Sequence, residues 1–336
     1  MDSAPTGTSQ PSRVESCDAE SRDGSAGPRG VDLKLVVCDM DGTLLDGEGA
    51  IPDDLWPVLE IMRRRRIAFV PASGRQYATL KSMFDRAEFD RAELSRTELS
   101  GTDGHDDEAG RDANMAFIAE NGAQLMRGGE LLAASVIDPE YVALTLERVE
   151  RLSAEGHDLG TVVCGTQGAY IHRDDDAFLA EVRTYYRRHR VVEDLSAVRD
   201  DVIKIAVYDF GDAEKGIYPR LRDANQNCAG HDQHGHGRAD QAHRVVLSGK
   251  HWIDVSNTEA TKGHALAQLQ DILAIGPAQT AAFGDYLNDL DLFDHAELSY
   301  AMANSHPDLF DRARFVAPSN LDGGVVSTLK HLLALD

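Results

Sequence analysis

The chain has 336 residues and a formal net charge of −23, from 57 acidic and 34 basic side chains. This acidic balance argues against nucleic acid or an anionic membrane as the partner, because both would repel the protein. Hydrophobic residues make up 42% of the chain, but no apolar run approaches the roughly 18 residues of a membrane helix, and the N-terminus lacks a signal peptide pattern. We therefore expect a cytoplasmic protein. Its four cysteines are far apart, which favours free thiols over disulfides or a zinc cluster.

Residues 1–30 are rich in Ser, Gly, Pro and acidic residues and contain almost no large apolar side chains. They cannot bury enough surface to offset the entropy lost on ordering, so we predict a disordered tail. The apolar run Lys34–Cys38 follows and predicts a strand buried on both faces, as in a parallel sheet. Two aspartates, Asp39 and Asp41, stand where this strand ends.

The next elements alternate between helix and strand. Apolar residues at helical spacing between Asp53 and Arg66 predict a helix, and the stretches 67–75 and 115–123 predict two more buried strands. A repeated strand, helix, strand order is typical of an α/β fold with right-handed crossovers. Between the two strands, residues 85–114 are acidic and dotted with glycine, which indicates a loop insertion.

The pattern changes after residue 136. Residues 137–250 mix helix-like and strand-like stretches without the rhythm of buried parallel strands, which predicts a separate α+β domain. Its segment 225–243 is rich in His, Gly, Asp and Gln. Five of its side chains are potential metal ligands: Cys228, His231, His234, His236 and His243. Their spacing matches no zinc pattern, so we favour a flexible polar insert over a metal site.

The rhythm of buried strands returns after residue 250. Lys262 stands in the first turn of an amphipathic helix, and the stretch 279–293 predicts a strand that ends in a loop with Asp285, Asn288 and Asp289. We therefore predict one domain made of residues 31–136 and 251–336, interrupted by a second domain of residues 137–250.

The aspartates suggest a metal site. Asp39 and Asp41 point to the same side of an extended chain, at the carboxyl edge of the sheet, where open α/β folds bind ligands. Asp285 and Asp289 follow another predicted strand and can reach the same edge. Four carboxylates would repel one another strongly unless a divalent cation lay between them, and oxygen ligands without His or Cys favour Mg²⁺. We therefore predict a magnesium site formed by these four aspartates.

Other residues at the same edge suggest a phosphoryl group. Ser73 and Gly74 follow the second predicted strand, and Lys262 begins a helix that could reach them. A hydroxyl, a backbone N–H and an ammonium beside a divalent cation would cradle a phosphoryl group. The chain contains neither GxxxxGK[ST] nor GxGxxG after a strand, so nucleotide binding has no motif support. The inventory predicts phosphoryl transfer without a nucleotide cofactor.

Four motifs, in order, resemble those of the haloacid dehalogenase-like phosphatases. They are DMDGTLL at 39–45, SGR at 73–75, TKG at 261–263 and GDYLND at 284–289. IAENGA at 118–123 and AMANSHPDL at 301–309 further resemble the Cof-type branch, whose C2 cap lies between the second and third motifs. The resemblance implies a Rossmann-like parallel-sheet core with an inserted α+β cap of the C2 type.

The resemblance also implies a role for each motif residue. Asp39 would be the nucleophile that forms an aspartyl-phosphate. Asp41 would protonate the leaving alcohol and then activate water; the first of these roles needs the protonated form, which burial or neighbouring carboxylates would favour. The phosphoryl oxygens would be held by Ser73, Gly74, Lys262 and Asn288. The Mg²⁺ ligands would be Asp39, Asp285 and the carbonyl of Asp41, with Asp289 acting through water. Arg75 would either contact the substrate or pair with a surface acid.

The expected function is that of a Mg²⁺-dependent phosphatase acting on a small phosphate ester, such as a sugar phosphate or a phosphorylated cofactor precursor. Two alternatives use the same residues. A phosphomutase would return the phosphoryl group to the product, and a phospho-ligand sensor would bind without turnover. The presence of both Asp39 and Asp41 speaks against a sensor, because a pure binder needs no acid or base.

Overall fold

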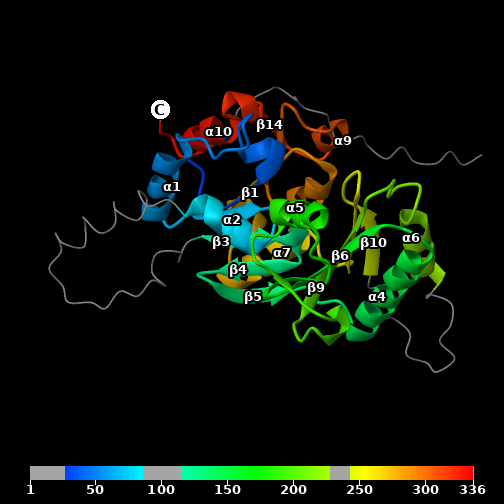
Figure 1. Ribbon diagram of the computed structural model, residues 1–336. Helices are drawn as coiled ribbons and strands as arrows, with labels where there is room; N and C mark the ends of the chain where they lie inside the picture. The colour runs from blue at the N-terminus through cyan, green and yellow to red at the C-terminus, as the bar shows by residue number, and fades with distance from the viewer. Residues whose placement is uncertain (1–26, 86–114, 228–242, 336) are drawn as a thin grey trace, which may run out of the picture.

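The computed structural model describes residues 27–85, 115–227 and 243–335. The predicted tail at 1–30 and the predicted inserts at 85–114 and 225–243 therefore lie almost entirely outside the described residues. The described chain forms two units that lie side by side, each built on its own sheet (Figure 1). None of the helices in the described residues combines the length and the apolar character of a membrane span.

The first unit, called the core here, contains an eight-stranded sheet. In spatial order its strands are β14 (Phe315–Ala317), β13 (Leu298–Met302), β12 (Thr280–Gly284), β1 (Leu35–Asp39), β2 (Ala68–Ala72), β3 (Ala116–Ala119), β4 (Gln124–Arg127) and β5 (Glu130–Ala134). The first six strands are parallel, and β4 and β5 add an antiparallel edge. At the centre, Cys38 of β1 lies opposite Phe283 of β12, and Asp39 lies opposite Ala72 of β2. The carboxyl ends of β1, β2 and β12 therefore meet at one edge.

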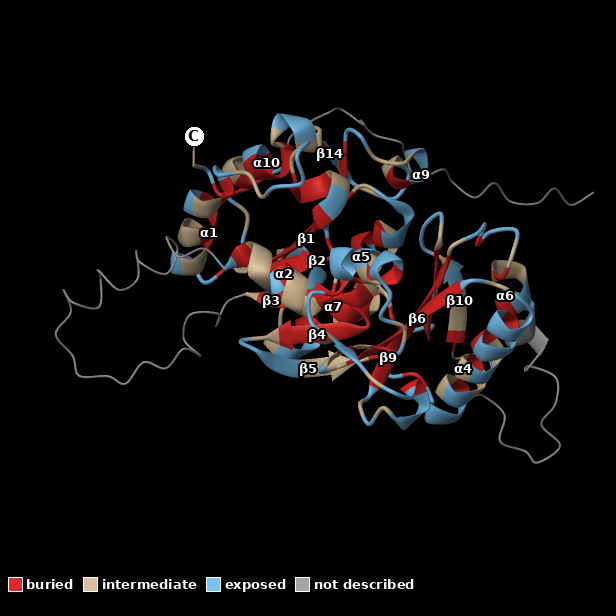
Figure 2. Ribbon diagram, in the orientation of Figure 1, coloured by how far each residue is buried: buried red, intermediate tan, exposed pale blue. Residues whose placement is uncertain are grey.

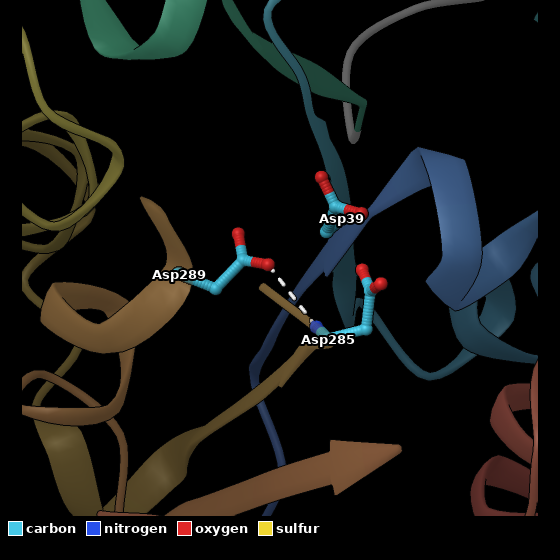
Figure 3. Close-up of side chains that lie close together, drawn as sticks. All are labelled: Asp39, Asp285 and Asp289. Carbon is cyan, nitrogen blue, oxygen red and sulfur yellow. Dashed lines mark hydrogen bonds between the residues drawn. The ribbon is translucent and has the colours of Figure 1, made fainter. Parts of the chain in front are cut away.

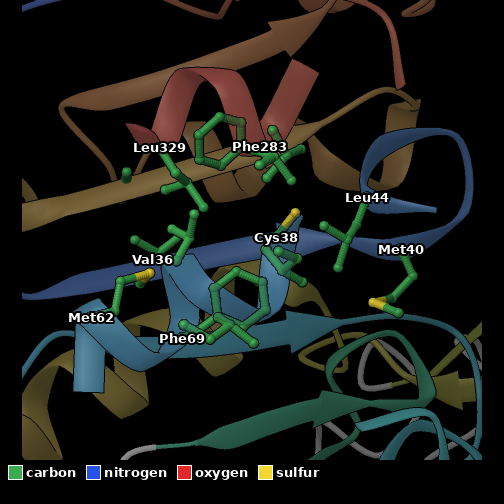
Figure 4. Packing of buried hydrophobic residues seen from close by; sticks show 14 of the residues in the cluster. Val36, Cys38, Met40, Leu44, Met62, Phe69, Phe283 and Leu329 are labelled. Atoms are coloured by element: carbon green, nitrogen blue, oxygen red, sulfur yellow. The ribbon is translucent and has the colours of Figure 1, made fainter. Parts of the chain in front are cut away.

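The central strand β1 is buried on both faces, as its continuous apolar run predicts. Val36 and Cys38 point into one hydrophobic cluster, which Figure 4 shows from close by, and Leu35 and Val37 point into another. The first cluster is covered by α1 (Leu55–Arg64), α2 (Tyr77–Phe84) and α10 (Gly324–Leu332), and the second by α7 (Lys262–Leu273), α8 (Leu290–Phe293) and α9 (Pro307–Phe310). Helices on both faces of a parallel sheet confirm the predicted α/β core.

Helix α1 shows how the sequence pattern forms the local structure. Its apolar residues recur every three or four positions and are buried against the sheet: Leu55, Val58, Leu59 and Met62. Pro57 lies in the first turn, where its missing N–H costs no hydrogen bond. At the other end, the guanidinium groups of Arg63 and Arg64 pair with Glu60 and are partly exposed to solvent.

The second unit, called the cap here, contains a six-stranded sheet. In spatial order its strands are β10 (His243–Leu247), β11 (Trp252–Asn257), β9 (Val202–Asp209), β6 (Leu159–Gly165), β7 (Gly168–Ile171) and β8 (His189–Val191). Its helices are α4 (Pro139–Ala154), α5 (Asp176–Tyr185) and α6 (Tyr218–Asn227). All neighbouring strands are antiparallel except β7 and β8, and the helices cover the sheet with their outer faces exposed (Figure 2).

Strand β11 corrects the predicted boundary between the two units. The sequence pattern ends the inserted domain at residue 250, but β11 (Trp252–Asn257) pairs with β9 and β10 of the cap sheet. Four of the six residues of β11 are buried, as in a buried core strand, so the sequence pattern did not separate this strand from the core. We propose that the cap spans residues 137–257 and the core the remainder of the described chain. Cys38 and Cys164, the two cysteines within the described residues, are free thiols, as predicted, and both are buried.

Candidate active site

Three carboxylates lie together at the carboxyl edge of the core sheet. Asp39 ends β1, and Asp285 and Asp289 belong to the loop that follows β12 (Figure 3). One carboxylate oxygen of each lies within 4.8 Å of the others; Asp39 and Asp289 are buried and Asp285 is partly buried. Two hydrogen bonds within the loop hold its conformation: the backbone N–H groups of Asp285 and Tyr286 donate to Oδ2 of Asp289 at 3.1 and 3.2 Å. The parallel pairing of β1 with β12 therefore brings these acids together.

Lys262, the first residue of α7, is the cation beside this cluster. Its ammonium lies 2.5 Å from Oδ1 of Asp39 and 2.6 Å from Oδ1 of Asp289, and its side chain is 1% exposed. Burial alone would lower the pKa of Lys262, but the carboxylates of Asp289 and Asp39 outweigh it and raise that pKa, so the ammonium stays charged.

The cluster carries more negative charge than Lys262 can balance. Burial raises the pKa of Asp39 well above its usual value; Lys262 opposes this rise, and Asp289 and Asp285 add to it. Burial also raises the pKa of Asp285, although a hydrogen bond of 2.9 Å from the Thr43 hydroxyl to its Oδ1 opposes the rise. Three close carboxylates with one ammonium and no His or Cys are the donor set of a hard divalent cation. The cluster could therefore hold a metal ion.

The side chain of Asp41 lies outside this cluster, whereas the sequence predicted that its carboxylate would join the magnesium site. It sits in the tight turn Met40–Leu44 after β1 and is 57% exposed. The guanidinium of Arg75 donates two hydrogen bonds to the Asp41 carboxylate, 2.9 Å from Nε to Oδ2 and 2.5 Å from Nη2 to Oδ1. The carboxylate is thus neither buried nor surrounded by other acids. Of the two readings for Arg75, the structure shows pairing with an acid, and that acid is Asp41.

Gly42 allows the turn after β1 to approach Asp285. Its φ is +83°, a conformation that side chains rarely adopt, and a Cβ at this position would lie 2.3 Å from Oδ2 of Asp285. Only glycine fits this contact without moving the carboxylate.

The predicted phosphate-binding residues lie at the same edge. Ser73 follows β2 and is buried, and its hydroxyl accepts a hydrogen bond of 3.2 Å from the backbone N–H of Arg75. Gly74 is next in the chain, and a Cβ there would lie 3.0 Å from the side-chain amide of Asn121. The amide of Asn288 donates to Oδ1 of Asn121 at 3.3 Å. Together with Lys262, these residues form a polar rim beside the acidic cluster.

The turn Glu120–Gly122, which follows β3, lies within the motif IAENGA, but the sequence analysis gave its residues no part in the site. All three residues have positive φ: 51° at Glu120, 57° at Asn121 and 95° at Gly122. For a residue with a side chain this conformation costs about 1–2 kcal/mol, although Asn tolerates it better than Glu. The Asn-Gly pair directly after a buried strand was the available signal.

A cavity of about 250 Å³ lies between the cap sheet and the polar rim. From the core it is lined by Glu120, Asn121, Thr261, Lys262, Leu287, Asn288, Leu290 and Asp291, and from the cap by Lys204, Arg244, Val246, Ser248, Asp254 and Ser256. Arg244 donates to the hydroxyl of Ser256 at 3.2 Å and to the carbonyl of Ala260, and burial lowers its pKa. The carboxylates of Asp291 and Asp254 oppose this lowering, and the guanidinium, a cation absent from the sequence prediction, faces the cavity.

The sequence of the chain matches a known family. The model of the haloacid dehalogenase-like hydrolases matches residues 36–329, and the chain belongs to this family. It is 24% identical over 303 residues to a 5-amino-6-(5-phospho-D-ribitylamino)uracil phosphatase of Escherichia coli strain K12, covering 90% of this chain and 96% of that protein. A Bacillus subtilis protein of the same name is 38% identical over 87 residues, 26% of this chain and 30% of that one.

Solved structures show the same fold. A haloacid dehalogenase-like hydrolase of Bacteroides thetaiotaomicron superimposes with a TM-score of 0.67 at 20% identity, covering 89% of this chain and 98% of that one. One from Bacillus subtilis gives 0.62 at 21% identity, covering 90% and 100%. These likenesses confirm the predicted Rossmann-like core with a cap. Family and relatives together identify the chain as a phosphatase, a hydrolase of phosphoric monoesters.

Proposed function

We propose that the protein is a Mg²⁺-dependent phosphatase that hydrolyses a small phosphorylated metabolite through an aspartyl-phosphate. The observation that carries the proposal is the buried cluster of Asp39, Asp285 and Asp289 with the ammonium of Lys262 between two of its members. When held by these carboxylates and the Asp41 carbonyl, with Asp289 acting through water, Mg²⁺ would supply positive charge that offsets the charge of the phosphoryl oxygens.

In the first step, an oxygen of Asp39 attacks phosphorus in line as the bond to the leaving oxygen breaks. Lys262 holds the Asp39 carboxylate in place, and the backbone of Gly74 and the side chains of Ser73 and Asn288 hold the phosphoryl oxygens. The leaving oxygen takes a proton from Asp41 and departs as an alcohol.

In the second step, Asp41 removes a proton from water, which attacks the phosphorus of the aspartyl-phosphate and releases inorganic phosphate. Asp41 has become a carboxylate by giving up its proton in the first step, and the two hydrogen bonds from Arg75 orient it. The bond between phosphorus and Asp39 breaks, and the free carboxylate is restored. The exposed position of Asp41, outside the metal cluster, leaves it room to reach both the leaving group and water.

The substrate class follows from the cavity and the relatives. A space of about 250 Å³ lined by polar and charged side chains suits a small polar leaving group. Two relatives are named as phosphatases of 5-amino-6-(5-phospho-D-ribitylamino)uracil, a polyol phosphate joined to a pyrimidine. We propose a sugar phosphate or a phosphorylated cofactor precursor of this kind.

The test is a panel of phosphate monoesters assayed for release of inorganic phosphate, with Mg²⁺ and with EDTA. The panel would contain sugar phosphates, flavin precursors and p-nitrophenyl phosphate. We expect Mg²⁺-dependent release from at least one small ester. A panel without any release in Mg²⁺ would contradict the phosphatase, and an isomerised sugar phosphate in place of free phosphate would indicate a mutase.

A further inference from the structure

A buried ion pair joins the cap to the core. The ammonium of Lys204, on β9 of the cap, contacts the carboxylate of Glu120, which follows β3 of the core. Their side chains are 8% and 2% exposed, and Oδ2 of Asp254 lies 3.9 Å from the ammonium. Burial raises the pKa of Glu120, and Lys204 only partly offsets this rise. A carboxylate buried so deeply depends on its cation, because an unpaired buried charge is costly.

The ion pair depends on where the cap lies. Its two members belong to different units, so the pair requires the cap to lie against the core. Neutral contacts also join the units: the side chain of Gln76 exchanges hydrogen bonds of 3.0 and 2.8 Å with the backbone of Arg188, and Gln124 donates to the carbonyl of Thr166. Unlike these neutral contacts, the ion pair leaves a buried charge behind if only one member is lost.

Glu120 also begins the turn Glu120–Gly122, which carries Asn121 of the polar rim. The left-handed backbone of this turn is held by two hydrogen bonds, from the N–H of Glu120 to the carbonyl of Arg75 at 3.1 Å and from that of Asn121 to the carbonyl of Ser73 at 2.9 Å. The conformation directs the amide of Asn121 toward Asn288. Residues with side chains keep this conformation only where surrounding contacts impose it.

The same turn supports the helix that carries Lys262. A Cβ on Gly122 would lie 2.0 Å from the carbonyl oxygen of Thr261, so the two backbones are in direct contact. One turn of three residues therefore touches the cap, the phosphate-binding rim and the start of α7.

We propose that Glu120 and Lys204 are positioning residues. Through them, contact between the cap and the core sets the conformation of the polar rim that binds phosphate. This inference rests on the proposed phosphatase function. Lys204 neutralises Glu120 when the cap is seated, and the turn is then held in the conformation that places Asn121 against Gly74 and Asn288. With the cap away, the Glu120 carboxylate turns toward water, the turn relaxes, and the rim binds phosphate less tightly.

The test compares four variants with the parent in Mg²⁺ buffer: Lys204→Met, Glu120→Gln, the double variant of both, and Lys215→Met. Lys215 is a matched control, because it is a cap lysine whose side chain is 83% exposed. The measurements are kcat and KM for p-nitrophenyl phosphate, the inhibition constant of inorganic phosphate, and amide hydrogen exchange of the peptide Ala116–Ala123.

Lys204→Met leaves the Glu120 carboxylate without its cation, so the seated state is disfavoured. We expect the inhibition constant of phosphate to rise about tenfold or more, KM to rise with it, and exchange at Glu120 and Asn121 to become faster while that of β1 is unchanged. In the double variant, phosphate inhibition and hydrogen exchange should both return most of the way to the parental values, because an amide and a methionine can be buried together. Lys215→Met should match the parent.

Phosphate inhibition within twofold of the parent in Lys204→Met, or a double variant no better than that single variant, would overturn the coupling. If Lys204→Met does not fold, Glu120→Gln must show the same direction of both effects, and parental values there would overturn it as well. Failure of the proposed function looks different: the parent itself would release no phosphate and would bind none.

Discussion

The ammonium of Lys262 lies 2.5 Å from a carboxylate oxygen of Asp39, although 223 residues separate the two in the chain. Both side chains are buried, and the same ammonium reaches Asp289. The contact joins the part of the core that precedes the cap to the part that follows it. It also fixes the orientation of the carboxylate that we propose as the nucleophile.

Replacing Lys262 with Met should weaken both catalysis and the fold. The variant leaves three neighbouring carboxylates without the cation that balances them, so the rate of hydrolysis should fall by about 10²-fold or more. In EDTA the free energy of unfolding should fall by about 3–5 kcal/mol, as for other buried pairs that lose one member. Phosphate release and urea unfolding measure the two effects. Parental values of both would exclude a role for this contact.

Replacing Asp39 with Asn should abolish hydrolysis and leave the fold intact. The amide keeps the size of the side chain but is a poor nucleophile, so kcat should fall by at least about 10³-fold, or about 4 kcal/mol of activation free energy. Substrate binding, measured by calorimetry with Mg²⁺ present, should change little. Residual activity within about tenfold of the parent, or about 1.4 kcal/mol, would contradict the nucleophilic role.

The stability of the metal-free protein should depend on Asp285 and on pH. Burial raises the pKa of this carboxyl, so the folded protein binds its proton more tightly than the unfolded chain does. Its contribution to stability is therefore complete below the unfolded value of about 3.8 and is lost as pH rises through the higher folded value. In EDTA at pH 7, Asp285→Asn should consequently unfold at a higher temperature than the parent.

This difference should vanish below about pH 4, where the parent also carries a neutral side chain. Saturating Mg²⁺ should reverse the order at pH 7, because the parent binds the ion through Asp285 and ligand binding to the folded state raises its stability. Thermal unfolding across this pH range measures both effects. A parent more stable than the variant in EDTA at neutral pH would show that the cluster needs no metal.

Replacing Gly42 with Ala should weaken metal binding. The new Cβ would lie 2.3 Å from Oδ2 of Asp285 and must displace this carboxylate, so the Mg²⁺ concentration for half-maximal activity should rise about tenfold. Gly49→Ala is the control, since Gly49 has a similar φ of +76° and no atom within 4 Å of the new Cβ. Both variants should lose about 1–2 kcal/mol of stability from backbone strain, and only Gly42→Ala should need more Mg²⁺.

Replacing Arg75 with Gln separates its two readings. If Arg75 serves to hold Asp41, kcat should fall about 10–100-fold and KM should change little, because the acid and base loses its orientation. Arg75→Lys should recover only part of this loss, since an ammonium cannot reproduce the two-pronged contact. A rise in KM with an unchanged kcat would instead identify a substrate contact.

The sequence predicted the core of the fold well because its signals are local. Each buried strand is visible in the sequence as an apolar run such as Lys34–Cys38, and each site residue follows such a run or begins a helix. The right-handed crossover rule then brings the strand ends to one edge. For this reason Asp39, Lys262 and Asp285 could be placed together without a structure.

What the sequence could not predict depends on side-chain direction and on contacts between the units. The carboxylates of Asp39 and Asp41 were expected to share the metal. In the turn after β1, however, the Asp41 side chain points away from the cluster and pairs with Arg75. The ion pair of Glu120 with Lys204 joins segments with no common motif. Likewise, Arg244 faces the cavity only because β10 packs against β11 in one register.

The pairing of β1 with β12 has a consequence for synthesis on the ribosome. Strand β1 emerges early and can pair with β2, but its other edge stays open until the entire cap has been translated and β12 follows. An unpaired apolar strand edge invites association with other chains. Nascent chains that stop within the cap should therefore depend on chaperones, and the catalytic centre should form only after β12 and the loop that follows it have been translated.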